Sequence, residues 1–206
     1  MYLKDPMAIE NRSMDIIEEV MKDTSFSQQE KIIVKRMIHT TGDFEYRKIV
    51  DFRNDFVSRA LASIEEGGVI FTDSKMAYVG INKRALSKSK CRLKCFIDNE
   101  RTFSLSKELK TTRSQAAVDL AVEEGIDMFV IGNAPTALFR LLELVKEGKV
   151  KPRFIVGVPV GFVGAAESKE LLRELDMPSI STVGTKGGSN VAASIINALL
   201  YMGVGR

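Results

Sequence analysis

The sequence predicts an α/β protein with a doubly wound, parallel, five-stranded sheet and an N-terminal helical extension. Short apolar runs predict strands at 68–72, 93–98, 127–132, 153–158 and 179–183, and helical patterns fall at 82–88, 112–124, 135–147, 165–175 and 188–202. Strands that alternate with helices form parallel sheets covered on both faces. The 206 residues fit one domain, 1–206, with a helical part at 1–66 and a flavodoxin-like sheet part at 67–206.

The composition excludes several classes of protein. Apolar residues make up 45% of the chain and charged residues 28%, which suits a full core beneath a hydrated surface. A net charge of +3 is too small to indicate binding to nucleic acid or to a membrane surface. Because the sequence has no long apolar run and no signal-peptide pattern, we expect a cytoplasmic protein.

The first predicted helix covers residues 8–22. Its inner stripe, at helical spacing, consists of Ile9, Ser13, Ile16, Ile17, Val20 and Met21. Ser13 interrupts this apolar stripe. Its hydroxyl either bonds back to its own helix or points into a pocket, and both alternatives stay open here.

The second predicted helix carries His39, the only histidine of the chain. Ser27 and Glu30 form a capping-box pattern at its start, and Gly42 lies just past its end. His39 then sits in the last turn, where the helix dipole favours a protonated imidazole, as suits a general acid. The alternative is a packed histidine bonded to a loop. The polar run Thr40-Thr41-Gly42-Asp43, with Thr40 as a candidate contact, favours function.

A third helix is predicted over 46–65, ended by Gly67 and Gly68. Its inner face is formed by Ile49, Phe52, Phe56, Ala60 and Ile64. The two cysteines, Cys91 and Cys95, would point to one face of a strand. Since no further ligand pattern accompanies them, we expect no metal site.

In a doubly wound sheet, ligands bind beyond the carboxyl ends of the strands. Four loops there predict a site for anionic groups, because glycines and helix starts bring backbone N–H groups close to a ligand. The candidates in these loops are Asp73, Lys75, Met76, Asn133, Pro135, Thr136, Val160, Gly161, Phe162, Lys186, Gly187, Gly188 and Ser189. Arg113, at the start of the 112–124 helix, is a further candidate partner for a carboxylate, and a surface ion pair is its alternative.

The loops carry neither the P-loop nor the dinucleotide fingerprint, so a nucleotide is not favoured. The alternative to a ligand site is that the glycines only make tight turns.

Four stretches of the sequence resemble the precorrin-8X methylmutase family of corrin biosynthesis, also called cobalt-precorrin-8 methylmutase. They are Arg36-Met-Ile-His-Thr-Thr-Gly-Asp43, Ile131-Gly-Asn-Ala-Pro-Thr-Ala-Leu138, Gly157-Val-Pro-Val-Gly-Phe-Val-Gly-Ala-Ala-Glu-Ser-Lys169 and Lys186-Gly-Gly-Ser189. Thr112-Arg113-Ser114 and Asp73–Met76 add to the resemblance. The chain departs from the family at Thr185, where the family usually has Arg, so one possible carboxylate contact is missing while Lys186 remains.

The resemblance implies an isomerase that moves a methyl group from C11 to C12 of the tetrapyrrole, giving hydrogenobyrinate or cobyrinate. It implies no added cofactor, because the methyl comes from the substrate and any cobalt is held by the macrocycle. It also implies a homodimer with a pocket near the subunit interface. The role carried over to His39 is to protonate, or hydrogen-bond to, the ring C nitrogen. We further expect helix N-termini, loop N–H groups and cations such as Arg113 and Lys186 to bind the tetrapyrrole carboxylates. Ser13 is expected in the substrate site, and Met76, Val160 and Phe162 are expected to form apolar walls.

Two other functions compete with this one. A non-catalytic tetrapyrrole carrier of the same pathway would need the carboxylate-binding loops but would not need His39. An enzyme that binds a nucleotide or a sugar phosphate could use the same glycine loops, and phosphates rather than carboxylate-rich tetrapyrroles would then stabilise it.

Overall fold

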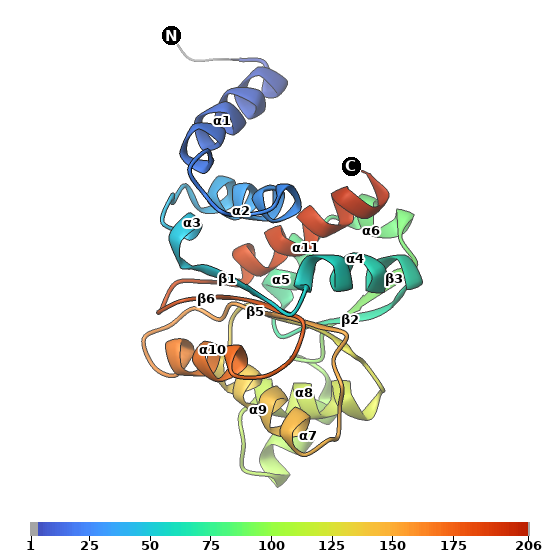
Figure 1. Ribbon diagram of the computed structural model, residues 1–206. Coiled ribbons are helices and arrows are strands. Elements are labelled where there is room, and N and C mark those ends of the chain that lie inside the picture. Colours follow the sequence, from blue (N-terminus) through green and yellow to red (C-terminus); the bar gives the residue numbers. More distant parts are fainter. Residues whose placement is uncertain (1–3, 206) are drawn as a thin grey trace.

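The structure is a computed structural model that describes residues 4–205, and its centre is a six-stranded sheet (Figure 1). The strands are β1 (Val50–Arg53), β2 (Gly68–Thr72), β3 (Cys91–Lys94), β4 (Met128–Ile131), β5 (Phe154–Gly157) and β6 (Ser179–Thr182). Their order across the sheet is β1-β6-β5-β4-β2-β3. Strands β2 to β6 are parallel, and numbered among themselves they give the order 2-1-3-4-5, so the flavodoxin-like prediction is confirmed.

The prediction of five strands is wrong by one, because β1 pairs antiparallel with β6 at the edge of the sheet. The predicted helix 46–65 is in fact α3 (Tyr46–Ile49), β1 and α4 (Phe56–Glu66). Asn54 and Asp55 separate β1 from α4 with left-handed φ angles of 51° and 54°. The side-chain amide of Asn54 holds this turn by donating to the distant carbonyls of Leu175 and Met177. The helical part expected at 1–66 therefore also supplies a strand.

Helices cover both faces of the sheet (Figure 1). On one face lie α2 (Gln28–Thr41), α4, α5 (Lys75–Gly80), α6 (Lys83–Lys88) and α11 (Ser189–Val204). On the other lie α7 (Glu100–Glu108), α8 (Arg113–Glu123), α9 (Pro135–Lys146) and α10 (Ala165–Arg173). The sequence did not predict α5 or α7, and β3 starts two residues earlier than expected and ends at Lys94. The other predicted strands and helices are present within about three residues of their expected ends.

The first face is built in successive layers. Helix α11 packs on the sheet, α2 packs on α11, and α1 (Pro6–Met21) packs on α2 and extends away from the body (Figure 1). Only the end of the predicted stripe on α1 is covered, since Ile17 and Met21 are buried while Ile9 and Ile16 are each 45% exposed. No helix within residues 4–205 has the length and apolar character needed to cross a bilayer.

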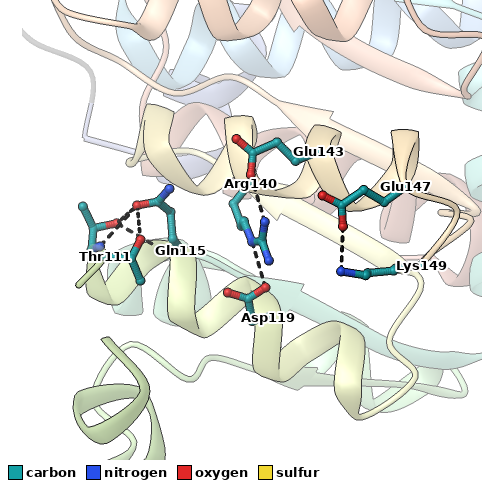
Figure 2. A network of polar contacts seen from close by, with 8 residues as sticks. Thr111, Gln115, Asp119, Arg140, Glu143, Glu147 and Lys149 are labelled. Carbon is teal, nitrogen blue, oxygen red and sulfur yellow. Dashed lines mark hydrogen bonds and ion pairs between the residues drawn. The ribbon is translucent and has the colours of Figure 1, made fainter. Parts of the chain in front are cut away.

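The outer face of the α8–α9 layer carries a polar network (Figure 2). Arg140 on α9 donates to Asp119 on α8 at 2.8 Å and to Glu143 at 2.9 Å. At the start of α8, Thr112 and Gln115 form a capping box, and the Thr112 hydroxyl donates to that of Thr136 at 3.2 Å. The Thr112–Thr136 contact joins the N-terminal ends of α8 and α9, and the Arg140–Asp119 contact joins the middles of the same two helices.

Candidate functional site

His39 lies at the end of α2, where the sequence predicts it. The capping box of Ser27 and Glu30 starts this helix, and Gly42 ends it with a left-handed φ of 67° and an N–H that donates to Ile38 O at 2.8 Å. Met37 and Ile38 are buried against α11. The helix is thus fixed in rotation, and His39 is left exposed to solvent. The alternative of a packed histidine does not fit this placement.

Beside His39 is a hollow of about 210 Å³ between α2 and α11. It is lined by Arg36, His39 and Thr40 of α2, Gly80 of α5, and Asn190, Ala193, Ser194, Asn197 and Tyr201 of α11. Most of these side chains are polar. The hollow therefore suits a polar group of a ligand, next to the one histidine.

The switch point of the sheet lies between β2 and β4. The backbone N–H groups there, which could bind an anion, already bind a carboxylate of the protein itself. The buried Asp73 carboxylate accepts the backbone N–H groups of Gly132, Asn133 and Ala134 at 2.9, 2.9 and 2.7 Å. Burial raises the pKa of Asp73, and the three amides oppose that shift. These amides open α9, so the helix start that the sequence predicts to bind a ligand anion already holds an internal carboxylate.

Close packing at the switch point explains two glycines. A Cβ at Gly132 would lie 2.7 Å from Ala192 Cβ, and one at Gly187 would lie 2.1 Å from Val158 O. The Gly188 N–H donates to Val158 O at 2.9 Å. Ser189 shares a hydrogen bond of 2.7 Å with Ser74, which caps α5. The loop 184–188 before α11, called the glycine loop below, thus joins α5, α11 and the end of β5 beside the hollow.

Lys186 is paired within the protein rather than free. Its ammonium donates to Asp43 Oδ2 at 2.5 Å and to Glu45 Oε2 at 2.7 Å. These hydrogen bonds raise the pKa of Lys186 and lower that of Asp43. Lys75, likewise, pairs with Asp98 at 2.9 Å.

A second lysine, Lys169, is buried beneath the glycine loop. Its ammonium donates to Lys186 O at 2.8 Å and to Thr182 Oγ1 at 3.1 Å. Burial, assisted by the nearby charge of Arg173, lowers the pKa of Lys169 to about 8. It supports the backbone of the loop from below.

The other predicted residues lie in three places. Asn133, Pro135, Thr136 and Arg113 gather at the starts of α8 and α9, with the Arg113 guanidinium 5.2 Å from the centre of the Phe103 ring. Met76, Val160 and Phe162 are exposed, Phe162 by 94%, and Gly161 N–H donates to Thr185 O at 3.1 Å. Ser13 on α1 bonds back to Ile9 O at 2.8 Å.

Seven of the nine residues that line the hollow are outside the predicted set, and Arg36 and Asn190 are two of them. Arg36 lies three positions before His39, so the two share one face of α2, and that spacing was a usable signal. Asn190 follows Ser189 on the first turn of α11, where nothing in the sequence distinguishes it. Among residues 4–205, no three His, Cys, Asp or Glu side chains gather as metal ligands would.

Comparison with known proteins gives one family. Residues 8–202 match the family model described as precorrin-8X methylmutase. A cobalt-precorrin-8 methylmutase of Salmonella typhimurium is 44% identical over 97% of both chains, and a precorrin-8X methylmutase of Sinorhizobium sp. is 39% identical over 98% of both. A crystal structure of precorrin-8x methyl mutase from Thermus thermophilus superimposes with a TM-score of 0.89, at 34% identity over 96% of each chain.

Proposed function

The chain belongs to the precorrin-8X methylmutase family of isomerases, and on that premise we propose that it moves a methyl group from C11 to C12 of precorrin-8X or cobalt-precorrin-8. The product is then hydrogenobyrinate or cobyrinate. The observation that carries the proposal is His39, the only histidine of the chain, exposed beside a polar hollow at the end of α2.

His39 acts as the proton donor. Its proton, given or hydrogen-bonded to the ring C nitrogen, draws electron density from C12. The bond from the methyl group to C11 breaks as the bond to C12 forms, and a proton that was transferred returns to His39 from the ring nitrogen. Atoms and electrons therefore balance without an oxidant or a reductant. Such a rearrangement needs one acid and close positioning, because the reacting carbons belong to the same molecule. No added cofactor is part of this proposal, and any cobalt belongs to the substrate.

The tetrapyrrole carboxylates bind at the edge of the sheet around the hollow. Thr40 lines the hollow beside His39, and Ser189 is the first residue of α11. Lys75 and Lys186 can reach a substrate carboxylate only by sharing it with, or leaving, their present acidic partners. The apolar walls of Met76, Val160 and Phe162 face the macrocycle.

A second copy of the chain completes the pocket. Sites for small molecules usually enclose about 300–1,000 Å³ and bury most of the ligand. The hollow beside His39 has about 210 Å³, which suits a part of a tetrapyrrole rather than the whole. Large apolar side chains are exposed near it, with Val160 beside Gly188 and Phe162 two residues further on. A homodimer would cover these side chains and enclose the macrocycle, and sedimentation at micromolar concentration tests this.

The test of function is a visible spectrum recorded over time. Purified protein is mixed with precorrin-8X, with and without cobalt, beside His39→Ala. Moving the methyl group off C11 returns that carbon to the conjugated system, so the absorption bands shift as product forms. We expect a shift with the unaltered protein in one of the two substrates, and bound but unchanged pigment with His39→Ala. Bound pigment without a shift in either substrate would indicate a carrier, and full activity of His39→Ala would remove His39 from the mechanism.

A further inference from the structure

Lys169 is a buried cation that the proposed reaction does not yet use. Its side chain on α10 is fully buried, and within residues 4–205 no carboxylate pairs with it. Its ammonium donates to two neutral oxygens, Thr182 Oγ1 at 3.1 Å and Lys186 O at 2.8 Å, and the charged group that acts on it, Arg173, has the same sign. A buried charge without a counter-ion costs stability. Departures of this kind from a stable core are typical of functional sites.

The carbonyl that Lys169 contacts belongs to the peptide bond between Lys186 and Gly187. The Thr182 hydroxyl donates to the same oxygen at 2.6 Å, so this carbonyl points into the protein. The peptide bond is trans, like the others within residues 4–205, and the C=O and N–H of a trans peptide point in opposite directions. The Gly187 N–H therefore points away from Lys169. It has no acceptor among residues 4–205, and Gly187 is partly exposed.

The unpaired N–H lies where the substrate is proposed to bind. Val160, which the proposed function places against the macrocycle, has its Cγ1 only 4.0 Å from a Cβ built at the neighbouring Gly188. A Cβ at Gly187 would lie 2.1 Å from Val158 O, so this glycine is packed tightly against the end of β5. The direction of its N–H is thereby fixed, and an acceptor for it has to come from a bound molecule.

The charge of Lys169 strengthens this N–H as a donor to an anion. A cation on the carbonyl polarises the peptide, and hydrogen bonds in series strengthen one another. From standard bond lengths and hydrogen-bond distances, a carboxylate on the Gly187 N–H would lie at most about 8 Å from the ammonium of Lys169. At an effective dielectric constant of about 20, opposite charges at this separation change a dissociation constant about ten- to thirtyfold.

We propose that Lys169 is a positioning residue for the substrate. It orients the Gly187 N–H toward the ligand and, through the peptide between Lys186 and Gly187, adds its positive charge to the binding of one tetrapyrrole carboxylate. The inference rests on the proposed function, because it takes the ligand from there. The carboxylate in turn supplies the negative charge that Lys169 lacks within the protein, so each charge stabilises the other across the peptide.

The test compares Lys169→Met with Thr182→Val, each of which removes one donor to the Lys186 carbonyl. Lys169→Met removes the buried charge and leaves the Thr182 hydroxyl on that carbonyl, whereas Thr182→Val leaves the charge in place. Binding of the purified tetrapyrrole product at pH 7 is followed by its absorption. We expect Kd to rise about tenfold in Lys169→Met and less than about threefold in Thr182→Val.

Urea unfolding separates this role from a structural one. Because an apolar side chain replaces an unpaired buried charge, Lys169→Met should be at least as stable as the unaltered protein at pH 7. Weaker binding without a loss of stability is therefore the expected result. A folded Lys169→Met protein that binds the product like the unaltered protein would overturn the inference.

The pH dependence of Kd is a second readout. Burial lowers the pKa of Lys169 to about 8, so the product should bind more weakly to the unaltered protein as the pH rises through this value. Neighbouring charges do not change with it, because the pKa of Lys186 is raised, that of Asp43 is lowered, and Arg173 keeps its proton. Strand β6 has no titratable side chain, and α9 carries its ion pairs on its outer face (Figure 2). Lys169→Met should lack the trend, and the same trend in both proteins would overturn the inference.

The amide signal of Gly187 in proton–nitrogen NMR spectra gives a readout that needs no catalysis. It should move as the pH passes about 8 in the unaltered protein and stay in place in Lys169→Met. Product that binds tightly without moving this signal would overturn the inference. If the unaltered protein binds the pigment but does not convert its precursor, the proposed reaction fails, while the Kd comparison and the Gly187 signal still decide the role of Lys169.

Discussion

Replacing Asp73 by Asn should lower the free energy of unfolding by about 2–4 kcal/mol. The carboxylate accepts three buried N–H groups, one on Oδ1 and two on Oδ2. An asparagine has one oxygen, so at least one backbone donor is left unpaired and the new amide NH₂ faces it. Each unpaired buried group costs about 1–3 kcal/mol. The neutral amide avoids the cost of burying a charged carboxylate, which keeps the total loss of stability near the lower end of the range.

Urea unfolding measures this loss, and Asp98→Asn is the matched control. Asp98 pairs with Lys75 at 2.9 Å, but the two side chains are 62% and 51% exposed, so the control should change stability by less than about 1 kcal/mol. The unfolding midpoint of Asp73→Asn should fall by about 1 M. The folded variant should bind the tetrapyrrole normally, because the side chain at position 73 faces backbone N–H groups of the protein itself. Unchanged stability with lost binding would refute this reasoning and make Asp73 the substrate contact that the sequence predicts.

Three further predictions concern the loops at this edge. Folding lowers the pKa of Lys169 from 10.5 to about 8, so between these pH values the unfolded chain binds more protons at Lys169 than the folded protein does. This group therefore makes the free energy of unfolding rise with pH. Urea unfolding of Lys169→Met should lack that rise, and the same pH dependence in both proteins would contradict the prediction. Gly187→Ala should destabilise by about 1–3 kcal/mol through contact with Val158 O and weaken tetrapyrrole binding. Gly203→Ala should do neither, because its Cβ would make only van der Waals contacts, at 3.9 Å with Leu61 and 4.0 Å with Ile64. Phe162→Ala should leave the melting temperature unchanged, because the side chain is 94% exposed, and should raise KM. Leu109→Ala, at the exposed residue that caps the C-terminus of α7, is the control. An unchanged KM in Phe162→Ala would exclude Phe162 from the pocket.

Local patterns predicted the parts of the fold that local interactions decide. The capping box of Ser27 and Glu30, the left-handed Gly42 and the apolar runs are local features, and the structure confirms them, except that the run predicted at 93–98 is a strand at Cys91–Lys94. The helix predicted over 46–65 was wrong because its apolar spacing joined residues of three elements. The turn at Asn54 depends on carbonyls 121 and 123 residues away, and no window of sequence contains that information.

The site follows the same division. His39 could be placed, since its helix end is encoded within a few residues. The sequence could not show which anion-binding sites are free for a substrate, because the acidic side chains that fill them come from distant parts of the chain. The start of α9 is filled by Asp73, 59 to 61 residues earlier, and Lys186 is paired with acids 141 and 143 residues earlier.

This occupation changes which residues the substrate should meet. A carboxylate that approaches the start of α9 would have to displace a buried internal carboxylate, and one that approaches Lys186 would compete with two acids. Arg36, by contrast, has one long contact with a carboxylate, that of Glu10 at 3.5 Å, within residues 4–205. The free energy available for a substrate carboxylate is therefore greatest at Arg36, although the glycine loops carry the more familiar anion-binding pattern. If so, the glycines serve mainly to let α11 approach β4 and β5, and that close packing is what holds Asn190 and the wall of the hollow beside His39.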